Sequence, residues 1–479
     1  MKNSTRKNKK RNKKNRQIMI VTSLFVAVFL SMMGYTCYYA ATNQQELINN
    51  SYNGRQEIFA AQNRRGSIYA AGGQVLAETQ TDVNGNETRV YPYENLFAHV
   101  VGYASNGKFG IESTSNYYLI NSNAKLADKV ASDMAGTKYP GDSVYTSLNV
   151  GLQEIAYQSL GIYKGAVIVS EPSTGRILAM VSKPDFDPNQ IEAIWDDLLE
   201  DKDSTVLLNR ATQGLYPPGS TFKIITALEY IRENPDTYNQ YKYQCNGRFT
   251  LGEDVINCYH GTVHGSEDFA KSFAKSCNSS FANIGVKLDR AQFGNTLGNL
   301  LFNDKLPVTF AYNQSRLIIN EDSPDSAVIQ ASIGQGTTQI TPLHLNMITC
   351  AIANKGVVMK PYLVDCIKNN EGNIIKQFNP GTYRRLMSEE EAAILNGLMQ
   401  EVVKSGTATR LSGLSYTAAG KTGSAEFNSI KTDSHAWFTG FAPAQDPEVC
   451  VTIIIEGAGS GGDYAVPIAK RIFDEYFGV

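Results

Sequence analysis

Two side chains that lie three residues apart, Ser220 and Lys223, could form a nucleophile and its base. They stand in the segment Tyr216-Pro-Pro-Gly-Ser-Thr-Phe-Lys-Ile-Ile-Thr, where proline and glycine precede a strongly apolar run. This pattern predicts that Ser220 lies at a helix N-terminus and that Lys223 lies on the same face, one turn further in. The helix dipole and apolar surroundings disfavour an ammonium ion there, so Lys223 could serve as a base.

A lysine base is of interest because histidine is scarce in this chain. The sequence contains five histidines and no G-x-S-x-G motif, and none of the histidines stands in a setting that indicates a Ser-His-Asp triad. Ser-x-x-Lys itself occurs five times, so only the surrounding sequence distinguishes Ser220. The alternative is an ordinary helix cap beside a solvated lysine.

Two further motifs could complete such a site. Ser276-Cys-Asn278 follows a short helical stretch, and in a turn its hydroxyl and carboxamide could share one surface as a proton relay and an amide-binding group. The alternative is a polar cap without chemistry. Lys421-Thr422-Gly423-Ser424 continues a strand-like run whose backbone could hold a carboxylate or an oxyanion. A second motif of this kind, Lys404-Ser-Gly406, ends an amphipathic helix, and its lysine is expected to be a solvated capping residue.

The elements around these motifs indicate one α/β domain. Residues 165–171 and 176–182 predict a β-hairpin, and residues 417–423, 435–441 and 448–455 predict three more strands, followed by a helix over about 466–477. The stretch between is mostly helical. We therefore expect a sheet that is completed by pairing the two ends of this region.

The order of Ser220-Thr-Phe-Lys223, Ser276-Cys-Asn278 and Lys421-Thr-Gly423 resembles that of the penicillin-recognising serine acyltransferases. Arg65-Gly-Ser-Ile-Tyr and Gly110-Ile-Glu112 resemble marks of the class B penicillin-binding proteins, which are cell-wall transpeptidases. Ile333-Gly-Gln-Gly336 resembles the family's G-Q-G segment. Two departures, Ala70-Ala71 for the usual Asp-Arg and Ser147-Leu-Asn149 for the usual Ile-Asp, concern the N-terminal part.

The resemblance implies a role for each residue. Ser220 would attack the D-Ala-D-Ala carbonyl of a peptidoglycan stem peptide, Lys223 would take its proton, and Ser276 would relay a proton to the leaving D-alanine. Asn278 would hold the donor amide, Lys421 would keep Lys223 neutral, and Thr422 would bind the terminal carboxylate. Ser220 and Ser424 would provide the oxyanion N–H groups, beside Gly423.

The same resemblance implies partners and alternatives. β-Lactams would acylate Ser220, no cofactor or catalytic metal is expected, and a SEDS-family glycan polymerase is the implied membrane partner. A D,D-carboxypeptidase or a membrane β-lactam sensor would use the same site, whereas a β-lactamase would be expected to lack the anchor. The implied fold is a transpeptidase-like domain, an antiparallel sheet flanked by helices, with a small N-terminal α+β domain and one transmembrane helix.

The charge distribution predicts the topology of the chain. The first sixteen residues hold nine Lys or Arg and no acid, and the remaining 35 basic residues against 46 acidic ones leave a formal charge of −11. An acidic body disfavours nucleic acid as a partner. Residues 18–41 carry no charge and are long enough to span a bilayer, so the positive-inside rule places the N-terminus in the cytoplasm. A cleaved signal peptide is disfavoured by the length of this stretch and by the lack of a clear A-x-A site.

These observations divide the chain into four predicted parts: a cytoplasmic tail (1–17), an anchor (18–41), a polar non-catalytic pedestal with short alternating runs at 89–93 and 99–103 (42–145), and a transpeptidase domain (146–479).

Six cysteines in the exported part are too few for a disulfide scaffold. Cys245 and Cys258 are close enough in sequence to pair. The loop that contains Asp254, Cys258, His260 and His264 also offers the ligand types of a structural zinc site. Unpaired cysteines, a disulfide and a zinc site all stay open at this point.

Overall fold

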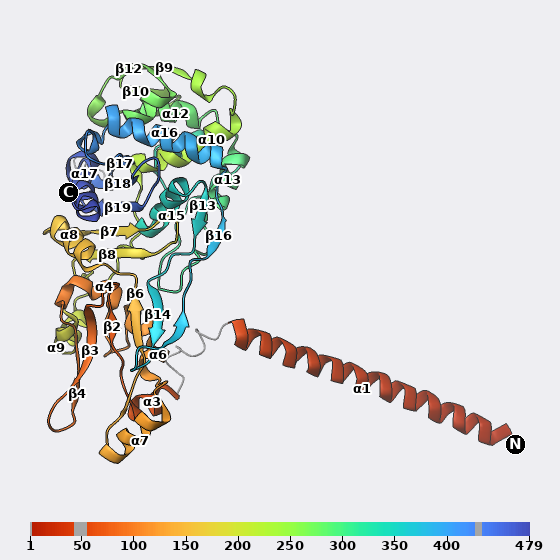
Figure 1. Cartoon of the computed structure of the whole chain (residues 1–479). Helices are drawn as coiled ribbons and strands as arrows, with labels where there is room; N and C mark the ends of the chain where they lie inside the picture. The colour runs from red at the N-terminus through yellow and green to blue at the C-terminus, as the bar shows by residue number, and fades with distance from the viewer. Residues whose placement is uncertain (1, 43–54, 427–433) are drawn as a thin grey trace. The chain divides into compact units, whose positions relative to one another are not determined.

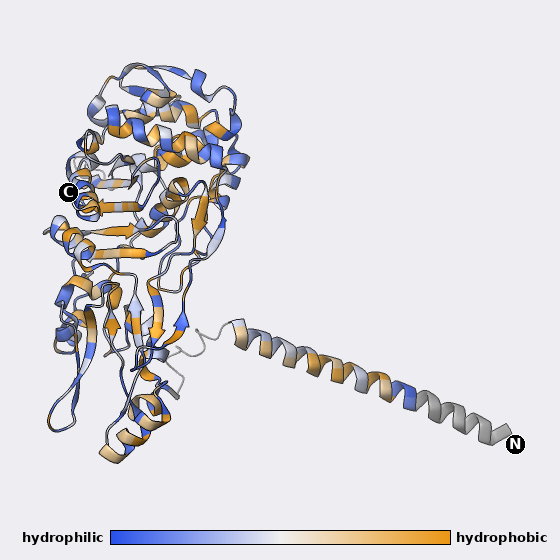
Figure 2. Ribbon diagram, viewed as in Figure 1, coloured by the Kyte–Doolittle hydropathy of each residue, from blue (hydrophilic) through white to orange (hydrophobic). Residues whose placement is uncertain are grey.

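The computed structural model describes residues 2–42, 55–426 and 434–479, which form two compact units, Met1–Phe59 and Ala60–Val479. In the first unit α1 (Lys2–Thr42) is continuous, and its part Asn15–Thr42 is long and apolar enough to cross a membrane. Figure 2 shows this apolar stretch. The predicted span 18–41 lies within it.

The second unit contains a six-stranded mixed sheet near its N-terminal end, in the order β15-β14-β6-β2-β3-β4. Two of these strands, β14 and β15, come from much later in the chain and complete the sheet (Figure 1). The division predicted at residue 145 stays a prediction. The strands are β2 (Ile68–Tyr69), β3 (Val75–Thr81), β4 (Glu87–Val90), β6 (Ser143–Thr146), β14 (Val364–Lys368) and β15 (Ile374–Gln377).

Short helices accompany this sheet. The alternating run at 99–103 is not a strand, because Ala98–Val101 forms the buried helix α4. A buried carboxylate, Glu112, pairs with Arg65 at 2.5 Å and with Arg89 at 2.7 Å and so joins three segments. The remaining elements here are β1 (Asn63–Arg64), η1 (Glu94–Phe97), α5 (Gly110–Thr114), α6 (Asn116–Ile120), α7 (Leu126–Ala135) and β5 (Tyr139–Pro140). The helix α3 (Arg55–Gln62) crosses the boundary between the two units.

The five-stranded antiparallel sheet has the order β17-β18-β19-β7-β8, so the two ends of the region pair as predicted. Every residue of β18 and β19 is buried, as expected for central strands covered on both faces. β17 is an edge strand. The strands are β7 (Gly165–Ser170), β8 (Ile177–Lys183), β17 (Ala419–Glu426), β18 (Ser434–Ala442) and β19 (Val449–Ile455).

Helices cover both faces of this sheet. α8 (Val150–Leu160) packs with α17 (Gly461–Phe477) on one face, and α15 (Pro342–Ala353) lies on the other (Figure 1). All twelve residues of α15 are buried, which identifies it as a core helix that is apolar on every side. The predicted final helix begins earlier than expected, at Gly461.

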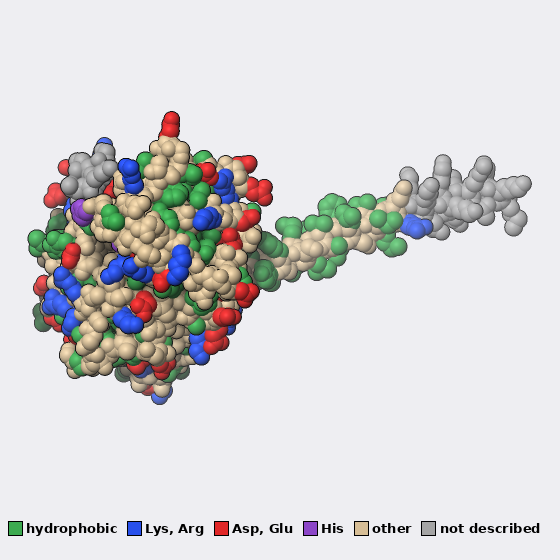
Figure 3. Space-filling view, turned by 90° about the horizontal axis from the view of Figure 1, so that it is seen from above, with side chains coloured by type: hydrophobic (Ala, Val, Ile, Leu, Met, Phe, Trp, Pro, Cys, Tyr) green, Lys and Arg blue, Asp and Glu red, His purple; other side chains and the backbone are tan. Residues whose placement is uncertain are grey.

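A helical layer with two small antiparallel sheets lies beyond β17. One sheet pairs β9 (Lys242–Cys245) with β12 (Gly265–Asp268), and the other is the hairpin of β10 (Arg248–Leu251) and β11 (Asp254–Asn257). Seen from above, basic and acidic side chains are interspersed over this face (Figure 3). The helices are α10 (Lys223–Glu233), α11 (Phe269–Ala274), α12 (Asn278–Gly285), α13 (Arg290–Asn299), α14 (Asp325–Ser332) and α16 (Glu389–Ser405). The other elements of the described residues are α9 (Ile191–Glu200), β13 (Val357–Met359), β16 (Thr382–Arg385) and five 3-10 turns, namely η2 (Pro188–Gln190), η3 (Gly219–Phe222), η4 (Tyr238–Gln240), η5 (Tyr259–Gly261) and η6 (Thr409–Leu411).

Candidate active site

Ser220 and Lys223 lie where the 3-10 turn η3 continues into α10. The predicted helix start is therefore confirmed, and Lys223 Nζ lies 3.1 Å from Ser220 Oγ. The Lys223 side chain is fully buried at the base of the site, whereas Ser220 lines an open cleft. This is the relative placement that a nucleophile and its base require.

The contacts of Lys223 can be satisfied by a neutral amine. Its Nζ lies 2.6 Å from the carbonyl oxygen of Ser276 and 2.7 Å from Oδ1 of Asn278, and both atoms can only accept. A neutral amine has two N–H bonds and one lone pair. If the two N–H groups donate to these oxygens, the lone pair is left to accept the proton of Ser220 Oγ.

Burial favours the neutral form of Lys223. Desolvation lowers the pKa of Lys223 to about 8, against a smaller opposing effect of negative charge on the nearby Cys277 and Cys258 sulfurs. Lys421 is also fully buried, and desolvation together with the charge of Lys223 lowers the pKa of Lys421 well below its ordinary value. The site therefore disfavours two ammonium ions at once.

Ser276 connects the two lysines. Its hydroxyl oxygen lies 3.2 Å from Nζ of Lys223 and 2.9 Å from Nζ of Lys421. The residue occupies the turn between α11 and α12 with a φ of 57°, a left-handed conformation that is unusual for serine. Asn278 begins α12, and its side-chain amide also donates to the carbonyl of Asn257 at 3.0 Å. The motif forms a turn rather than a helix, and its two side chains share one surface.

Lys421, Thr422, Gly423 and Ser424 lie along β17, the edge strand of the sheet. Lys421 Nζ also donates to the carbonyl of Thr422 at 3.0 Å, and Thr422, Gly423 and Ser424 line the cleft. An edge strand beside a cleft offers its backbone groups to an extended peptide.

Close packing of backbone brings η3 to β17. Gly219 has a φ of +53°, and a Cβ atom there would lie 2.8 Å from the carbonyl oxygen of Ser424. Gly219 N–H also donates to the carbonyl of Gly334 at 2.9 Å. A left-handed φ favours glycine, and the close backbone approach leaves no room for a side chain. The contact sets the backbone of Ser220 beside that of Ser424.

The cleft has a volume of about 400 Å³. Its lining contains most of the predicted residues, and also a residue that the sequence did not single out, Thr407, whose hydroxyl oxygen lies 2.5 Å from that of Thr422. Thr407 directly follows the Lys404-Ser-Gly segment. Lys404 itself is exposed at the end of α16 beside Glu401, as predicted. The lining residues are Ser220, Tyr259, Thr262, His264, Lys275, Ser276, Asn278, Thr407, Thr409, Arg410, Thr422, Gly423, Ser424, Ser460, Gly462 and Asp463.

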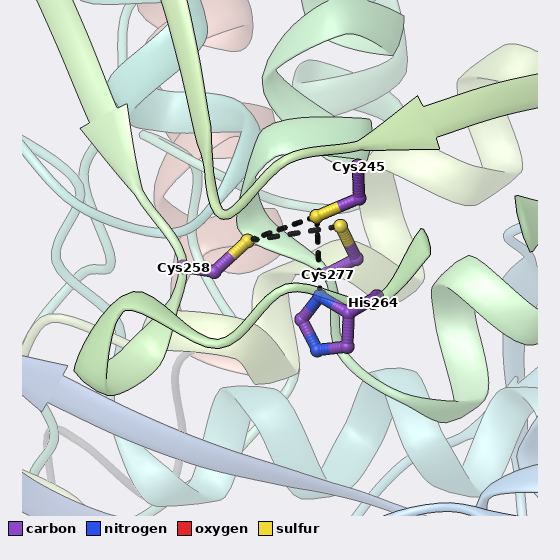
Figure 4. A group of neighbouring side chains, drawn as sticks. All are labelled: Cys245, Cys258, His264 and Cys277. Atoms are coloured by element: carbon purple, nitrogen blue, oxygen red, sulfur yellow. Dashed lines mark hydrogen bonds between the residues drawn. The ribbon is translucent and has the colours of Figure 1, made fainter. Parts of the chain in front are cut away.

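A group of cysteines with one histidine lies at one wall of the cleft. Cys245, Cys258 and His264 lie close together, as the ligands of one metal ion would, and Cys277 from the centre of the Ser276-Cys-Asn278 turn lies beside them (Figure 4). His260 is exposed against the ring of Tyr259 and is not part of this group. Cys277 is absent from the ligands predicted from the sequence, because this residue stands inside the Ser276-Cys-Asn278 motif, which indicated only an active-site role.

Comparison with known proteins agrees with this geometry. Residues 165–474 match the model of the penicillin binding protein transpeptidase domain, and residues 65–144 match that of the penicillin binding protein A dimerisation domain. The chain belongs to the penicillin-binding protein transpeptidase family.

Relatives and solved structures extend the match over nearly the whole chain. A Mycolicibacterium smegmatis protein named peptidoglycan D,D-transpeptidase PbpA is 31% identical over 487 residues, which cover 95% of this chain and 97% of that protein. Acinetobacter baumannii MrdA, also named a peptidoglycan D,D-transpeptidase, is 29% identical and covers 81% of this chain, with 66% of its own length matched.

Two solved structures are similar over most of their length. Penicillin-binding protein A from M. tuberculosis, as a ceftriaxone acyl-enzyme complex, has a TM-score of 0.79 and 29% identity, over 88% of this chain and 99% of that one. The D,D-transpeptidase domain from Eggerthella lenta has the same score and identity, over 87% and 99%. The predicted fold class is confirmed.

Proposed function

We propose that this chain is a membrane-anchored peptidoglycan D,D-transpeptidase that acts through an acyl-enzyme at Ser220 and is acylated by β-lactams. The observation that carries the proposal is the contact network of Lys223. It links the candidate nucleophile, the Ser276 relay and the Asn278 amide through one buried nitrogen. The relatives' names and the acyl-enzyme complexes of the similar structures support the same activity.

In the acylation step Ser220 Oγ attacks the carbonyl carbon of the penultimate D-alanine, while the lone pair of Lys223 takes the hydroxyl proton. An ester bond forms and the amide C–N bond breaks. The proton reaches the leaving amine through Ser276, whose hydroxyl contacts both lysines. The N–H groups of Ser220 and Ser424 stabilise the oxyanion.

The second step reverses the proton transfers with a new nucleophile. The amine of a neighbouring stem peptide attacks the ester carbonyl, an amide bond forms, and Ser220 Oγ recovers a proton. Before acylation, the edge of β17 holds the donor peptide in extended form, and Thr422 with Thr407 binds the carboxylate of the terminal D-alanine that leaves in the first step. A β-lactam opens its own amide at the same serine, so its leaving nitrogen stays tethered.

Replacing Ser220 tests the assignment. We expect Ser220→Ala to abolish covalent labelling of the full-length protein by a fluorescent penicillin. The control variant Lys404→Ala, at an exposed lysine of the second Lys-Ser-Gly motif, should be labelled like the wild type. Labelling of Ser220→Ala at an unchanged rate would refute the proposal. Product analysis with a stem-peptide donor, with and without an acceptor amine, separates cross-linking from simple carboxypeptidase cleavage.

We also propose the topology and a partner for the anchor. The nine cations before the apolar span place the N-terminus in the cytoplasm and the body outside. Residues 42–145 would form the non-catalytic pedestal, and a SEDS-family glycan polymerase would contact the anchor and pedestal. The stripe of Leu126, Val130 and Met134 exposed on α7 is a surface that such contact would bury. Loss of co-purification with the polymerase in a Leu126→Glu/Met134→Glu variant tests this contact, and unchanged recovery would exclude α7.

A further inference from the structure

Three thiols and one imidazole meet beside the active-site cleft. Cys245 Sγ lies 3.7 Å from Cys258 Sγ and 3.4 Å from His264 Nδ1, and Cys258 Sγ lies 3.8 Å from Cys277 Sγ. All four candidate ligand atoms lie within 4.8 Å of one another. Figure 4 shows the four side chains converging from the ends of β9 and β11, the start of β12 and the turn before α12.

These separations match a tetrahedral zinc site. With Zn–S bonds of about 2.3 Å and a Zn–N bond of about 2.0 Å, tetrahedral angles place two sulfurs about 3.8 Å apart and a sulfur and a nitrogen about 3.5 Å apart. A disulfide requires sulfurs about 2 Å apart. One disulfide would also leave the third thiol and the imidazole without a role.

The surroundings of the sulfurs suit thiolate ligands. The Ser279 hydroxyl donates to Cys245 Sγ at 3.1 Å and lies 3.3 Å from the sulfurs of both Cys258 and Cys277. The backbone N–H groups of Gly247 and Ser280 donate to Cys245 and Cys277, each at 3.4 Å. Hydrogen bonds of this kind stabilise metal-bound thiolates and orient them.

We propose that Cys245, Cys258, His264 and Cys277 bind one zinc ion as a closed Cys3His site that holds the Ser276-Cys-Asn278 turn and the adjoining wall of the cleft in place. Four protein ligands leave no position for substrate, so the ion is structural. Coordination releases the thiol protons to solvent and changes no oxidation state.

The position of Cys277 connects the proposed zinc ion to the active site. Cys277 stands between Ser276 and Asn278, both of which contact Lys223. The loop from Cys258 to His264 contributes Tyr259, Thr262 and His264 to the cleft. A zinc ion would therefore tie this wall to the residues that position the base.

The metal content of the full-length protein, purified in detergent without added metal, tests the site. We expect about one zinc per chain for the wild type and for Cys366→Ser, a control at a buried cysteine in β14. Cys258→Ser should lose most of the zinc. Less than about 0.1 zinc per chain in the wild type, or a disulfide between Cys245 and Cys258, would overturn the proposal.

A measurement on the wild type alone covers the case in which Cys258→Ser does not fold. A strong chelator should expose three further thiols to a chromogenic thiol reagent, and added zinc should protect them again. Co2+ added to the stripped protein should give the intense visible absorption of a tetrahedral thiolate site. If neither the chelator nor added zinc changes the reactivity of these thiols, the proposal is overturned.

The positioning role rests on the proposed function, and its readout is separate from metal content. Stripping should slow penicillin acylation of Ser220 by about tenfold or more, and zinc should restore the rate. An unchanged rate after complete removal of zinc would refute positioning. If the zinc-loaded protein does not react with penicillin at all, the proposed function fails while the metal site stands.

Discussion

The proposed proton-accepting role of Lys223 predicts how acylation depends on pH. The base must be neutral, and burial lowers the pKa of Lys223 to about 8. The neutral fraction is then about 1% at pH 6, about 9% at pH 7, about 50% at pH 8 and about 90% at pH 9. The second-order acylation rate should rise about tenfold from pH 6 to pH 7, about fivefold to pH 8, and less than about twofold beyond that.

The assay is the time course of labelling by a fluorescent penicillin at subsaturating concentration, with the full-length protein in detergent. Lys404→Ala should reproduce the wild-type profile, because this lysine is exposed at the end of α16 and belongs to the Lys-Ser-Gly motif outside the cleft. Intrinsic fluorescence at each pH checks that the fold is retained, since Trp437 is buried and its ring N–H donates to the carbonyl of Pro217 near the site.

Two results would refute this reasoning. A rate that stays constant from pH 6 to pH 8 would mean that the titration of Lys223 does not limit the base. A rate that falls as the pH rises over this range would require the ammonium form. Either result, obtained with folded protein, would contradict the assignment of Lys223 as a base with a pKa near 8.

Two further predictions concern the framework. Glu112→Gln should lower the free energy of unfolding by about 3 to 5 kcal/mol, because it leaves the charges of Arg65 and Arg89 unpaired around a fully buried side chain. Chemical denaturation measures this loss. Gly334→Ala should sharply reduce penicillin acylation, because its Cβ would lie 2.1 Å from the carbonyl oxygen of Gly219, next to the nucleophile, in a left-handed conformation.

Matched controls distinguish these effects from general damage. Glu87→Gln removes a partly exposed pair with Lys138 and should change stability by less than about 1 kcal/mol. Gly397→Ala, inside α16 where an added Cβ meets no atom within 4 Å, should leave acylation unchanged. Equal losses from Glu112→Gln and Glu87→Gln, or normal acylation by Gly334→Ala, would contradict the respective prediction.

The local structure of the candidate catalytic motifs could be predicted because each motif is short. Ser220 and Lys223 lie within one turn, and the Lys421 segment lies on one strand, so short patterns of glycine, proline and apolar residues indicate their geometry. The five-stranded sheet could be predicted for a similar reason, because its strands are long buried runs bounded by turns.

Long-range pairing left no such local signal. β14 completes the N-terminal sheet by pairing with β6, and nothing in either short segment indicates the other. Thr407 reaches Thr422 only because α16 packs against β17. The run at 99–103 alternates like a strand, yet burial on all sides of α4 decides its conformation.

The cysteine cluster shows how the order of residues in a loop can mislead about ligands. His260 and His264 share one loop, but His260 has a φ of 50° and turns outward onto Tyr259, while His264 turns towards Cys245. The fourth member, Cys277, comes from a different segment. The backbone conformation, which sets where each side chain points, therefore decides which residues join the cluster. The spacing of the residues in the sequence does not decide this.

The turn at Ser276 explains why these two sites adjoin. A left-handed serine costs of the order of 1 kcal/mol or more and persists only when its surroundings hold it. On one side Lys223 donates to its carbonyl and Lys421 to its hydroxyl. On the other side the N–H of Cys277 donates to Ser272, and its sulfur faces Cys258. The strength of the Lys223 hydrogen bond would change at each proposed proton transfer, because the lysine would alternate between a neutral amine and an ammonium ion. Restraint from the cysteine side does not change during the reaction, so the turn can keep its geometry while the proton moves.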